Sequence, residues 1–236
     1  MTDRSRTRPS PRVWAVLAGV LALLGLVAVL VAVTGQQRAP QPAAATAERP
    51  EPSTPADPSP PGRSSAPGPG VEDPVTGQAA EPVAAPVSVS VPSIGVTSDL
   101  LRLGLNDDGT VEVPPLEPDD RAGWYEPGPA PGAVGPAVIL GHVDSAEHGP
   151  GIFFDLGALQ PGDEVSVTRA DGTVAVFAVD RVERHPKEEF PTIDVYGNTD
   201  DAQLRLITCG GDFDSAVRSY EDNVIAFATL VGTRPA

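Results

Sequence analysis

The chain has 236 residues, of which 40% are hydrophobic and 20% charged, and its formal net charge is −16. Residues 1–86 hold seven basic and seven acidic side chains, so the acidic excess lies on residues 87–236, which carry 25 acidic and 9 basic side chains. Such a surface repels nucleic acid and anionic lipid headgroups, which excludes a nucleic-acid-binding protein. A single cysteine excludes an internal disulfide.

The first 34 residues predict a single-pass membrane anchor. Residues 1–12 carry four arginines, and the 21 residues 13–33 are apolar without a charged side chain. At about 1.5 Å per residue such a run crosses a hydrocarbon core of roughly 30 Å, so we expect a transmembrane helix over 13–34. The arginines place residues 1–12 in the cytoplasm and the rest of the chain outside the cell. Ala43-Ala44-Ala45 leaves cleavage behind the anchor as an alternative.

A stalk and one folded domain are expected to follow the anchor. Residues 35–86 contain 13 of the 28 prolines and almost no large apolar side chains. Such a segment cannot bury enough surface to offset its ordering entropy, so we expect a disordered, Pro/Ala-rich stalk. Residues 87–236 have mixed composition and regular apolar patterning, and about 150 residues suffice for a domain with its own core.

The outer domain has the short alternating runs of a mainly β fold. Residues 87–92 alternate with a period of two, and the turn at 106–109 leads into a further run at 111–113. The other predicted strands are 137–140, 164–168, 174–179, 203–209 and 223–231. Helical signals are confined to 152–158 and 191–196. About eight short strands with turns between them predict a closed barrel or a sandwich.

Cys209 ends the apolar run 204–209 and is followed by Gly210-Gly211. In an exported chain it is a buried bystander, an intermolecular partner or a nucleophile. Free cysteines are often buried and inert. This one lies at a strand end, and an exported protein gains little from an unpaired thiol that can oxidise. A cysteine nucleophile also needs a group that controls its proton and a donor for the oxyanion.

His142 is the candidate proton partner of this thiol. It follows a short buried strand in Gly141-His142-Val143-Asp144-Ser145, and a strand end holds a side chain firmly while leaving it accessible. His148 lies in a surface loop and His185 in a charged stretch. A loop histidine is more often a solvated polar residue than a catalyst, so the pattern favours His142 over the other two.

Arg218, nine residues after Cys209, is the candidate for a fixed positive charge near the thiol. Its alternative is a surface arginine that pairs with Asp214 or another nearby carboxylate. One cysteine and three histidines show none of the close spacings of zinc ligands, and Asp212 and Asp214 lack the dense carboxylate pattern of a calcium loop. We therefore expect no metal ion and no cofactor.

Short motifs around these residues occur in a recognisable order. Leu206-Ile207-Thr208-Cys209 closes one predicted strand, and Gly141-His142 closes an earlier one. With the anchor and stalk ahead of them, they resemble the sortases, membrane-anchored cysteine transpeptidases of Gram-positive bacteria. The motifs that resemble the actinobacterial class F group are Ala122-Gly123-Trp124-Tyr125, Pro131-Gly132, Gly141-His142-Val143-Asp144-Ser145, Thr208-Cys209-Gly210-Gly211-Asp212-Phe213-Asp214 and Tyr220-Glu221-Asp222-Asn223. The resemblance covers residues 87–232.

The resemblance implies an eight-stranded β-barrel with one or two short helices, and it implies roles for three residues. Cys209 would attack the Thr–Gly bond of an LPXTG-like sorting signal and form a thioester acyl-enzyme. His142 would be the acid and base, and Arg218 would bind the substrate carbonyl and the oxyanion. The implied partners are sorting-signal peptides of secreted proteins and a cell-wall precursor amine that resolves the acyl-enzyme.

Two positions depart from the family pattern. Arg205 stands where the family often has threonine. Many sortases place the arginine at the start of the final strand, where this chain reads Asp222-Asn223. Arg218 is the only arginine between Cys209 and that strand. Arg205 is the second candidate, because residues i and i+4 of a strand share a face.

Two other functions and one assignment stay open. The same thiol would serve a hydrolase with water as acceptor, and an anchored binding module would carry an incidental cysteine. The segment 182–202 occupies the place where sortases shape their specificity. The apolar residues of this segment either line a cleft or belong to the core. We expect them to be core residues: Phe190, Ile193, Val195 and Tyr196.

Overall fold

The structure, a computed structural model, describes residues 38–42, 82–117 and 120–236. The predicted cytoplasmic N-terminus, the transmembrane helix over 13–34 and most of the stalk over 35–86 lie outside these residues. Within the described ranges, no helix combines the length and the apolar character that crossing a membrane requires.

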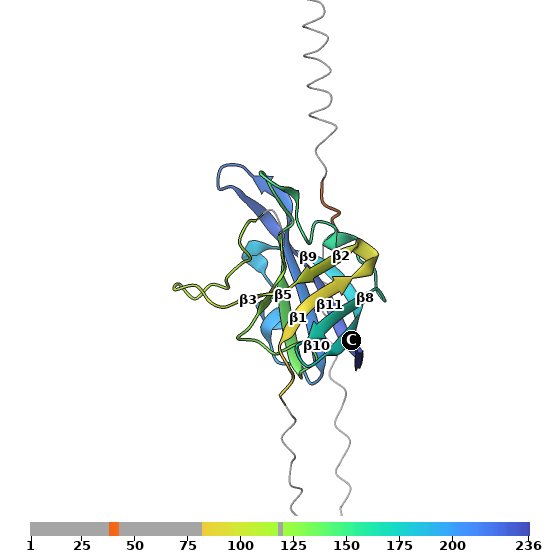
Figure 1. Cartoon of the computed structure of the whole chain (residues 1–236). Coiled ribbons are helices and arrows are strands. Elements are labelled where there is room, and N and C mark those ends of the chain that lie inside the picture. Colours follow the sequence, from red (N-terminus) through yellow and green to blue (C-terminus); the bar gives the residue numbers. More distant parts are fainter. Residues whose placement is uncertain (1–37, 43–81, 118–119) are drawn as a thin grey trace, which may run out of the picture. The chain divides into compact units, whose positions relative to one another are not determined.

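The described part of the outer domain is built from a nine-stranded sheet and a small two-stranded sheet (Figure 1). The large sheet has the order β2-β1-β8-β9-β11-β10-β5-β4-β3. Its strands are β1 (Pro86–Val91), β2 (Val96–Asp99), β3 (Leu101–Leu103), β4 (Gly123–Tyr125), β5 (Gly135–Leu140), β8 (Glu164–Arg169), β9 (Thr173–Pro186), β10 (Ala202–Asp214) and β11 (Ser219–Pro235). The small sheet pairs β6 (Asp144–Ser145) with β7 (Gly149–Pro150). The helical elements are α2 (Thr192–Tyr196) and 3₁₀ turns at Pro92–Ile94, Leu156–Ala158 and Lys187–Glu189.

The large sheet is nearly closed, because its two edge strands are neighbours in sequence. β2 pairs with β1 at one edge and β3 pairs with β4 at the other, and only Leu100 separates β2 from β3. The Leu100 amide donates to Val87 on the first side, and the next amide, of Leu101, donates to Ala122 on the second. The continuous segment formed by β2, Leu100 and β3 therefore connects the two edges of the sheet. The predicted mainly β, barrel-like fold is confirmed, but the large sheet has nine strands where the resemblance implied eight, because β3 and β4 are short strands that the sequence pattern did not reveal.

β10 separates two apolar layers, since its side chains alternate between the two faces of the sheet. Leu204 and Leu206 are fully buried inside the barrel. Ile207 faces the other way and joins a second cluster beneath α2. This outer cluster consists of Val138, Val195, Ile207, Ile225 and Phe227. The face of β10 that carries Ile207 is also the face that carries Arg205 and Cys209.

The predicted strands are present except one, and three are longer than expected. β9, β10 and β11 each continue past their apolar runs into paired polar residues. Residues 111–113 form no strand, because Val111 makes only an isolated bridge with Leu105 across the turn at 106–109. The helical signal at 191–196 corresponds to α2, whereas 152–158 contains only the 3₁₀ turn at Leu156–Ala158.

The apolar residues of the segment 182–202 divide between core and surface. Val195 is fully buried in the outer cluster, and Phe190 and Tyr196 pack against it. Ile193 is 83% exposed. The expectation of core residues therefore holds for three of the four, and Ile193 lies on the solvent side of α2.

Three residues of the predicted stalk range, Pro40, Gln41 and Pro42, lie against the barrel. The Gly211 amide donates to Gln41 Oε1 at 3.0 Å. The Pro40 carbonyl approaches Gly157 so closely that a Cβ at that position would collide with it. This short stretch therefore packs beside Gly210 and Gly211, directly after Cys209 on β10.

Candidate active site

β5 and β10 pair in parallel, and their register runs toward His142 on one chain segment and Cys209 on the other. The register joins Leu140 to Ile207. The Gly141 amide donates to the Ile207 carbonyl at 3.1 Å, which extends the pairing one residue beyond β5. His142 and Cys209 stand two residues further along their chains than Leu140 and Ile207. The same register, continued by two residues beyond β5, would make them partners on one face of the sheet.

A backbone carbonyl orients the His142 imidazole. Its Nε2 lies 2.7 Å from the Pro114 carbonyl oxygen. That oxygen can only accept, so the partner assigns the ring proton to Nε2. In the neutral ring Nδ1 is then the acceptor that a thiol proton needs. The His142 carbonyl is also held, since it accepts from the Phe153 amide at 3.0 Å.

Cys209 is a free cysteine that is partly exposed. The two residues before it, Ile207 and Thr208, are buried. Pairing with β11 is regular through Cys209, and the register shifts between Gly210 and Phe213. The thiol thus lies at the last regular stretch of β10, on a rigid strand and within reach of a reagent. Partial exposure argues against the buried, inert thiol that the sequence left open.

Four side chains form a row across neighbouring strands, and we name it the polar row: His142, Cys209, Asn223 and His185. Cys209 is the Cα partner of Asn223, and Asn223 is the partner of His185 on β9. His185 Nε2 lies 3.0 Å from Glu183 Oε2. Burial raises the pKa of Glu183, but hydrogen bonds from His185 and Arg181 outweigh it and lower the pKa below its usual value. His185, the last residue of the polar row, is therefore paired with the Glu183 carboxylate.

Arg218 lies at the exposed tip of the β10–β11 hairpin. It has a left-handed φ of 56° and falls in the turn beyond the last strand pair, Asp214 with Ser219. Cys209 pairs with Asn223 at the other end of this extension of the hairpin. The structure thus places Arg218 in the hairpin turn and does not bring it into the polar row.

Arg205, the second candidate, is 4% exposed and engaged beneath α2. Its Nε donates to the Asp194 carbonyl at 3.1 Å, and its Nη2 donates to Gln203 Oε1. The guanidinium also lies over the Phe227 ring, 4.7 Å from the centroid. Burial, together with the charge of Arg181, lowers the pKa of Arg205 to about 10. These contacts direct the guanidinium to α2 and its surroundings.

One hydrogen bond ties the β10–β11 hairpin to the loop that follows His142. The Tyr220 hydroxyl donates to Asp144 Oδ2 at 2.6 Å, and the Phe213 ring packs edge-on against Tyr220 with centroids 5.2 Å apart. Burial raises the pKa of Tyr220, and Asp144 and the nearby Cys209 raise it further. The hydroxyl therefore stays protonated as a donor, close to the thiol.

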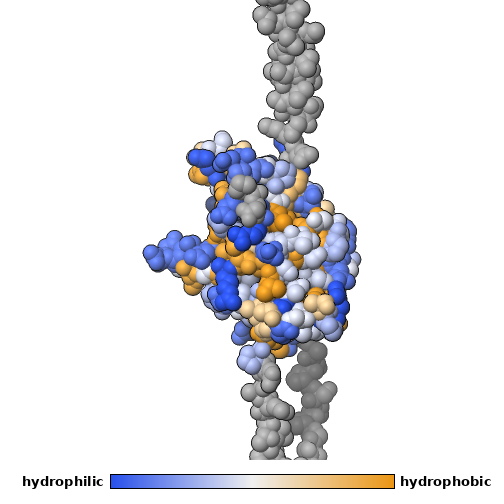
Figure 2. All heavy atoms as spheres, viewed as in Figure 1, coloured by the Kyte–Doolittle hydropathy of each residue, from blue (hydrophilic) through white to orange (hydrophobic). Residues whose placement is uncertain are grey.

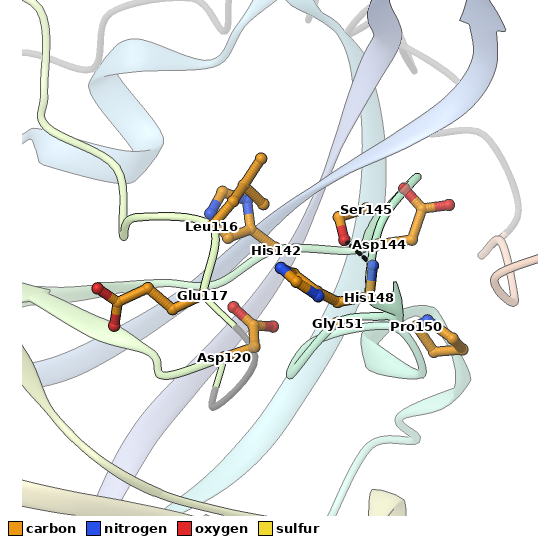
Figure 3. A pocket seen from close by; sticks show the side chains of 9 residues that line it. All are labelled: Leu116, Glu117, Asp120, His142, Asp144, Ser145, His148, Pro150 and Gly151. Atoms are coloured by element: carbon orange, nitrogen blue, oxygen red, sulfur yellow. Dashed lines mark hydrogen bonds between the residues drawn. The ribbon is translucent and has the colours of Figure 1, made fainter.

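A pocket of about 200 Å³ of empty volume opens beside His142 (Figure 3). Its lining residues are Leu116, Glu117, Asp120, His142, Asp144, Ser145, His148, Pro150 and Gly151. In Figure 3, Glu117 and Asp120 lie on one side of His142, and Asp144 and Ser145 lie on the other. Its three carboxylates make the pocket acidic. Across the described ranges, no group of three or more His, Cys, Asp or Glu side chains is arranged to hold a metal ion.

A partly exposed cysteine beside a histidine that a third group orients is the arrangement of a cysteine enzyme that transfers acyl groups. The chain belongs to the sortase family, because the family model of the sortase domain matches residues 89–231. It is therefore a cysteine transpeptidase that acts on sorting signals.

Two solved structures of sortases are similar to this chain. The SrtA sortase from Actinomyces oris is 24% identical, with a TM-score of 0.50 over 67% of this chain and 89% of that one. Sortase A of Listeria monocytogenes is 21% identical, with a TM-score of 0.48 over 64% and 91%. Comparison with curated proteins found no match. At such identities the structures bear on the fold alone.

The comparisons do not bear on the individual residues of the site. Cys209 and His142 were predicted from the sequence, and their roles stay predictions. Pro114, Asn223 and Tyr220 were not singled out as site residues. The tetrapeptide 220–223 and the family position at Asp222-Asn223 were the only signals that pointed toward two of them.

Proposed function

We propose that this chain is a class F-type, actinobacterial sortase that cleaves an LPXTG-like sorting signal and transfers it to a cell-wall amine. The observation that supports the proposal is the parallel register of β5 and β10, which runs from Leu140 toward His142 on one strand and from Ile207 toward Cys209 on the other. The class F assignment rests on the motifs around Trp124, His142 and Cys209. The choice of an LPXTG-like signal follows from the same resemblance.

The first half-reaction forms a thioester. His142 Nδ1 takes the proton of the Cys209 thiol, and Sγ attacks the carbonyl carbon of the Thr–Gly bond. The carbonyl oxygen takes up the negative charge of the tetrahedral intermediate. The C–N bond then breaks, and the imidazolium gives its proton to the leaving amine. Pro114 keeps the ring in the orientation that both transfers need.

The second half-reaction resolves the thioester. The acceptor ammonium first loses one proton to solvent. The neutral amine then attacks the thioester carbonyl, His142 takes a second proton from the attacking nitrogen, and Sγ leaves as a thiolate and regains that proton from the imidazolium. The carboxylates Glu117, Asp120 and Asp144 beside His142 favour a cationic acceptor, because an amine arrives largely protonated. Water in place of the amine would give the hydrolytic product, and analysis of the products distinguishes the two reactions.

The full chain is proposed to act outside the cell, anchored in the membrane through residues 13–34. The apolar run and the four arginines before it support this topology. Residues 35–86 would then connect the membrane with the catalytic domain over 87–236.

Mass spectrometry of the full chain incubated with an LPXTG-like peptide tests the proposal. We expect an adduct on Cys209 with the mass of the peptide up to its threonine, and none in Cys209→Ala. His142→Ala should slow adduct formation by about 10²- to 10⁴-fold, the usual contribution of a positioned acid or base. His148→Ala, a histidine of the same pocket outside the polar row, is the matched control and should change the rate little. Turnover in Cys209→Ala would refute the proposal.

A further inference from the structure

An attack by Cys209 on a carbonyl needs a hydrogen-bond donor for the developing oxyanion. Such a donor must lie on the face of the sheet that carries Sγ, within about 3 Å of the oxygen. Arg218 lies in the hairpin turn, and the guanidinium of Arg205 is engaged by Asp194 and Gln203. Neither arginine has the position that this role requires.

A third arginine, Arg184, lies close in sequence to the polar row but on the other face of the sheet. It is the register partner of Val224, which points into the barrel core. Its Nε lies 3.3 Å from Asp222 Oδ2. Since neighbouring residues of a strand face opposite sides, Arg184 and Asp222 lie behind the sheet as seen from Cys209.

Asn223 has the position that the arginines lack. It is the Cα partner of Cys209 in the antiparallel β10–β11 ladder, so both side chains leave the same face. Directly opposed residues in such a ladder have Cβ atoms about 4.5–5.5 Å apart. The polar row places His142 on one side of the thiol and Asn223 on the other.

The Asn223 carboxamide is available to a substrate. The side chain is half-buried, and its carboxamide group makes no hydrogen bond to another described residue. Asparagine is depleted in strands, and the five residues that follow, 224–228, are all buried and apolar. The fold alone therefore gives no reason for an amide at this position, whereas its two N–H donors suit an oxyanion.

We propose that Asn223 is a catalytic residue of this enzyme, whose Nδ2 donates a hydrogen bond to the substrate carbonyl oxygen as Cys209 attacks. The proposal rests on the proposed function and adds to it a neutral oxyanion donor. His142 handles the proton and Asn223 the charge on oxygen, and the two flank the sulfur from the adjacent strands.

Two reactions of the Cys209 thiol distinguish an oxyanion donor from a residue that only supports the fold. Acylation by p-nitrophenyl acetate forms an S–C bond, passes through an oxyanion and releases p-nitrophenolate. Alkylation by iodoacetamide forms an S–C bond and releases iodide without any oxyanion. Both are measured at Cys209 on the full chain, with Cys209→Ala as background, and neither requires the natural sorting signal.

Asn223→Ala removes the donor, and Asn223→Asp keeps the shape while replacing the donor by a carboxylate. We expect acylation to slow by about 10²-fold or more in both variants, as for other oxyanion donors. Alkylation should stay within about twofold in Asn223→Ala. Asn198→Ala, an exposed asparagine after α2, is the matched control and should leave both rates unchanged. Thermal unfolding shows whether each variant is folded.

Acylation of both variants within twofold of the wild type would overturn the proposal. An equal loss of acylation and alkylation in Asn223→Ala would also overturn it, because Asn223 would then act on the thiol and not on the oxyanion. A wild-type thiol that iodoacetamide alkylates but that neither the ester nor a sorting peptide acylates would instead refute the proposed function, and this proposal with it.

Discussion

Arg205 places a charged side chain inside the otherwise apolar packing between β10 and α2. It donates to the Asp194 carbonyl and to Gln203 and lies over the Phe227 ring. We predict that Arg205→Ala lowers the free energy of unfolding by about 2 kcal/mol or more, because hydrogen bonds to charged groups contribute about 1.5–3 kcal/mol each. Urea denaturation measures the loss. Arg205→Lys should recover only part of it, since an ammonium lacks the planar fork.

Arg205→Ala also tests whether Arg205 contributes to stability alone or to the reaction of Cys209 as well. Acylation of Cys209 by the folded fraction of Arg205→Ala should stay within about twofold of the wild type, since no contact of Arg205 leads to the thiol. A loss of about 10²-fold at unchanged stability would mean that Arg205 binds the oxyanion, as its place in the sequence suggested.

Arg218 offers the complementary test. The side chain is exposed in the turn between Asp214 and Ser219. We predict that Arg218→Ala changes acylation by no more than about twofold, the usual effect of a surface substitution. A loss of about 10²-fold in the ester assay would assign the oxyanion to this arginine and leave Asn223 without the role.

At this scale the sequence identified the reactive groups but not their helpers. Cys209 was conspicuous as the one thiol at a strand end, and His142 as a histidine at another. Pro114 has ordinary sequence surroundings, and Tyr220 and Asn223 were marked only as parts of a family motif without roles of their own. Their relation to the thiol depends on strand register and loop conformation, which arise from pairings between distant segments.

Among the elements, the β10–β11 hairpin decides how Cys209 is presented. The Tyr220–Asp144 hydrogen bond holds the hairpin to the loop of His142. We predict that Tyr220→Phe speeds hydrogen exchange of the hairpin amides 211–221 by about fivefold, because a net hydrogen bond contributes about 1 kcal/mol. Amides of the β8–β9 pair serve as the internal control. Unchanged exchange in 211–221 would show that the hairpin is held by its own pairing.

Apolar alternation located the strands whose two faces differ in polarity, such as β1 and β8. It could not locate the ends of β9, β10 and β11, because their outer parts pair without burying an apolar face. β3 and β4 are three residues each and leave too short a pattern. The parallel pairing of β5 with β10 joins segments more than 60 residues apart, so alternation alone could not show that His142 and Cys209 meet, and their pairing was inferred from their chemistry and from the family resemblance.

The surface of the described domain mixes polar and apolar areas, as Figure 2 shows for one face. The acidic excess of residues 87–236 suits the extracellular location proposed for this domain, and the proposed anchor over 13–34 is separate from it in sequence. The described residues do not include that anchor, so only experiment on the full chain tests it.

For the anchor, we predict that the full chain fractionates with membranes in a Gram-positive host. Leu24→Arg combined with Val27→Arg should abolish this, because each arginine at a helix centre costs about 2.5–3.5 kcal/mol for insertion. The double alanine variant at the same two positions is the matched control and should remain in the membrane. Wild-type protein in the soluble fraction would contradict the proposed topology.

The proposed chemistry depends on the thiol of Cys209 on β10 and the imidazole of His142 sharing a proton. The most direct measurement is the rate at which a mild alkylating agent labels Cys209 in the folded full chain. We predict labelling without unfolding, a slower rate in His142→Ala and an unchanged rate in His148→Ala. Labelling that begins only when the chain unfolds, or a rate that does not depend on His142, would contradict the account.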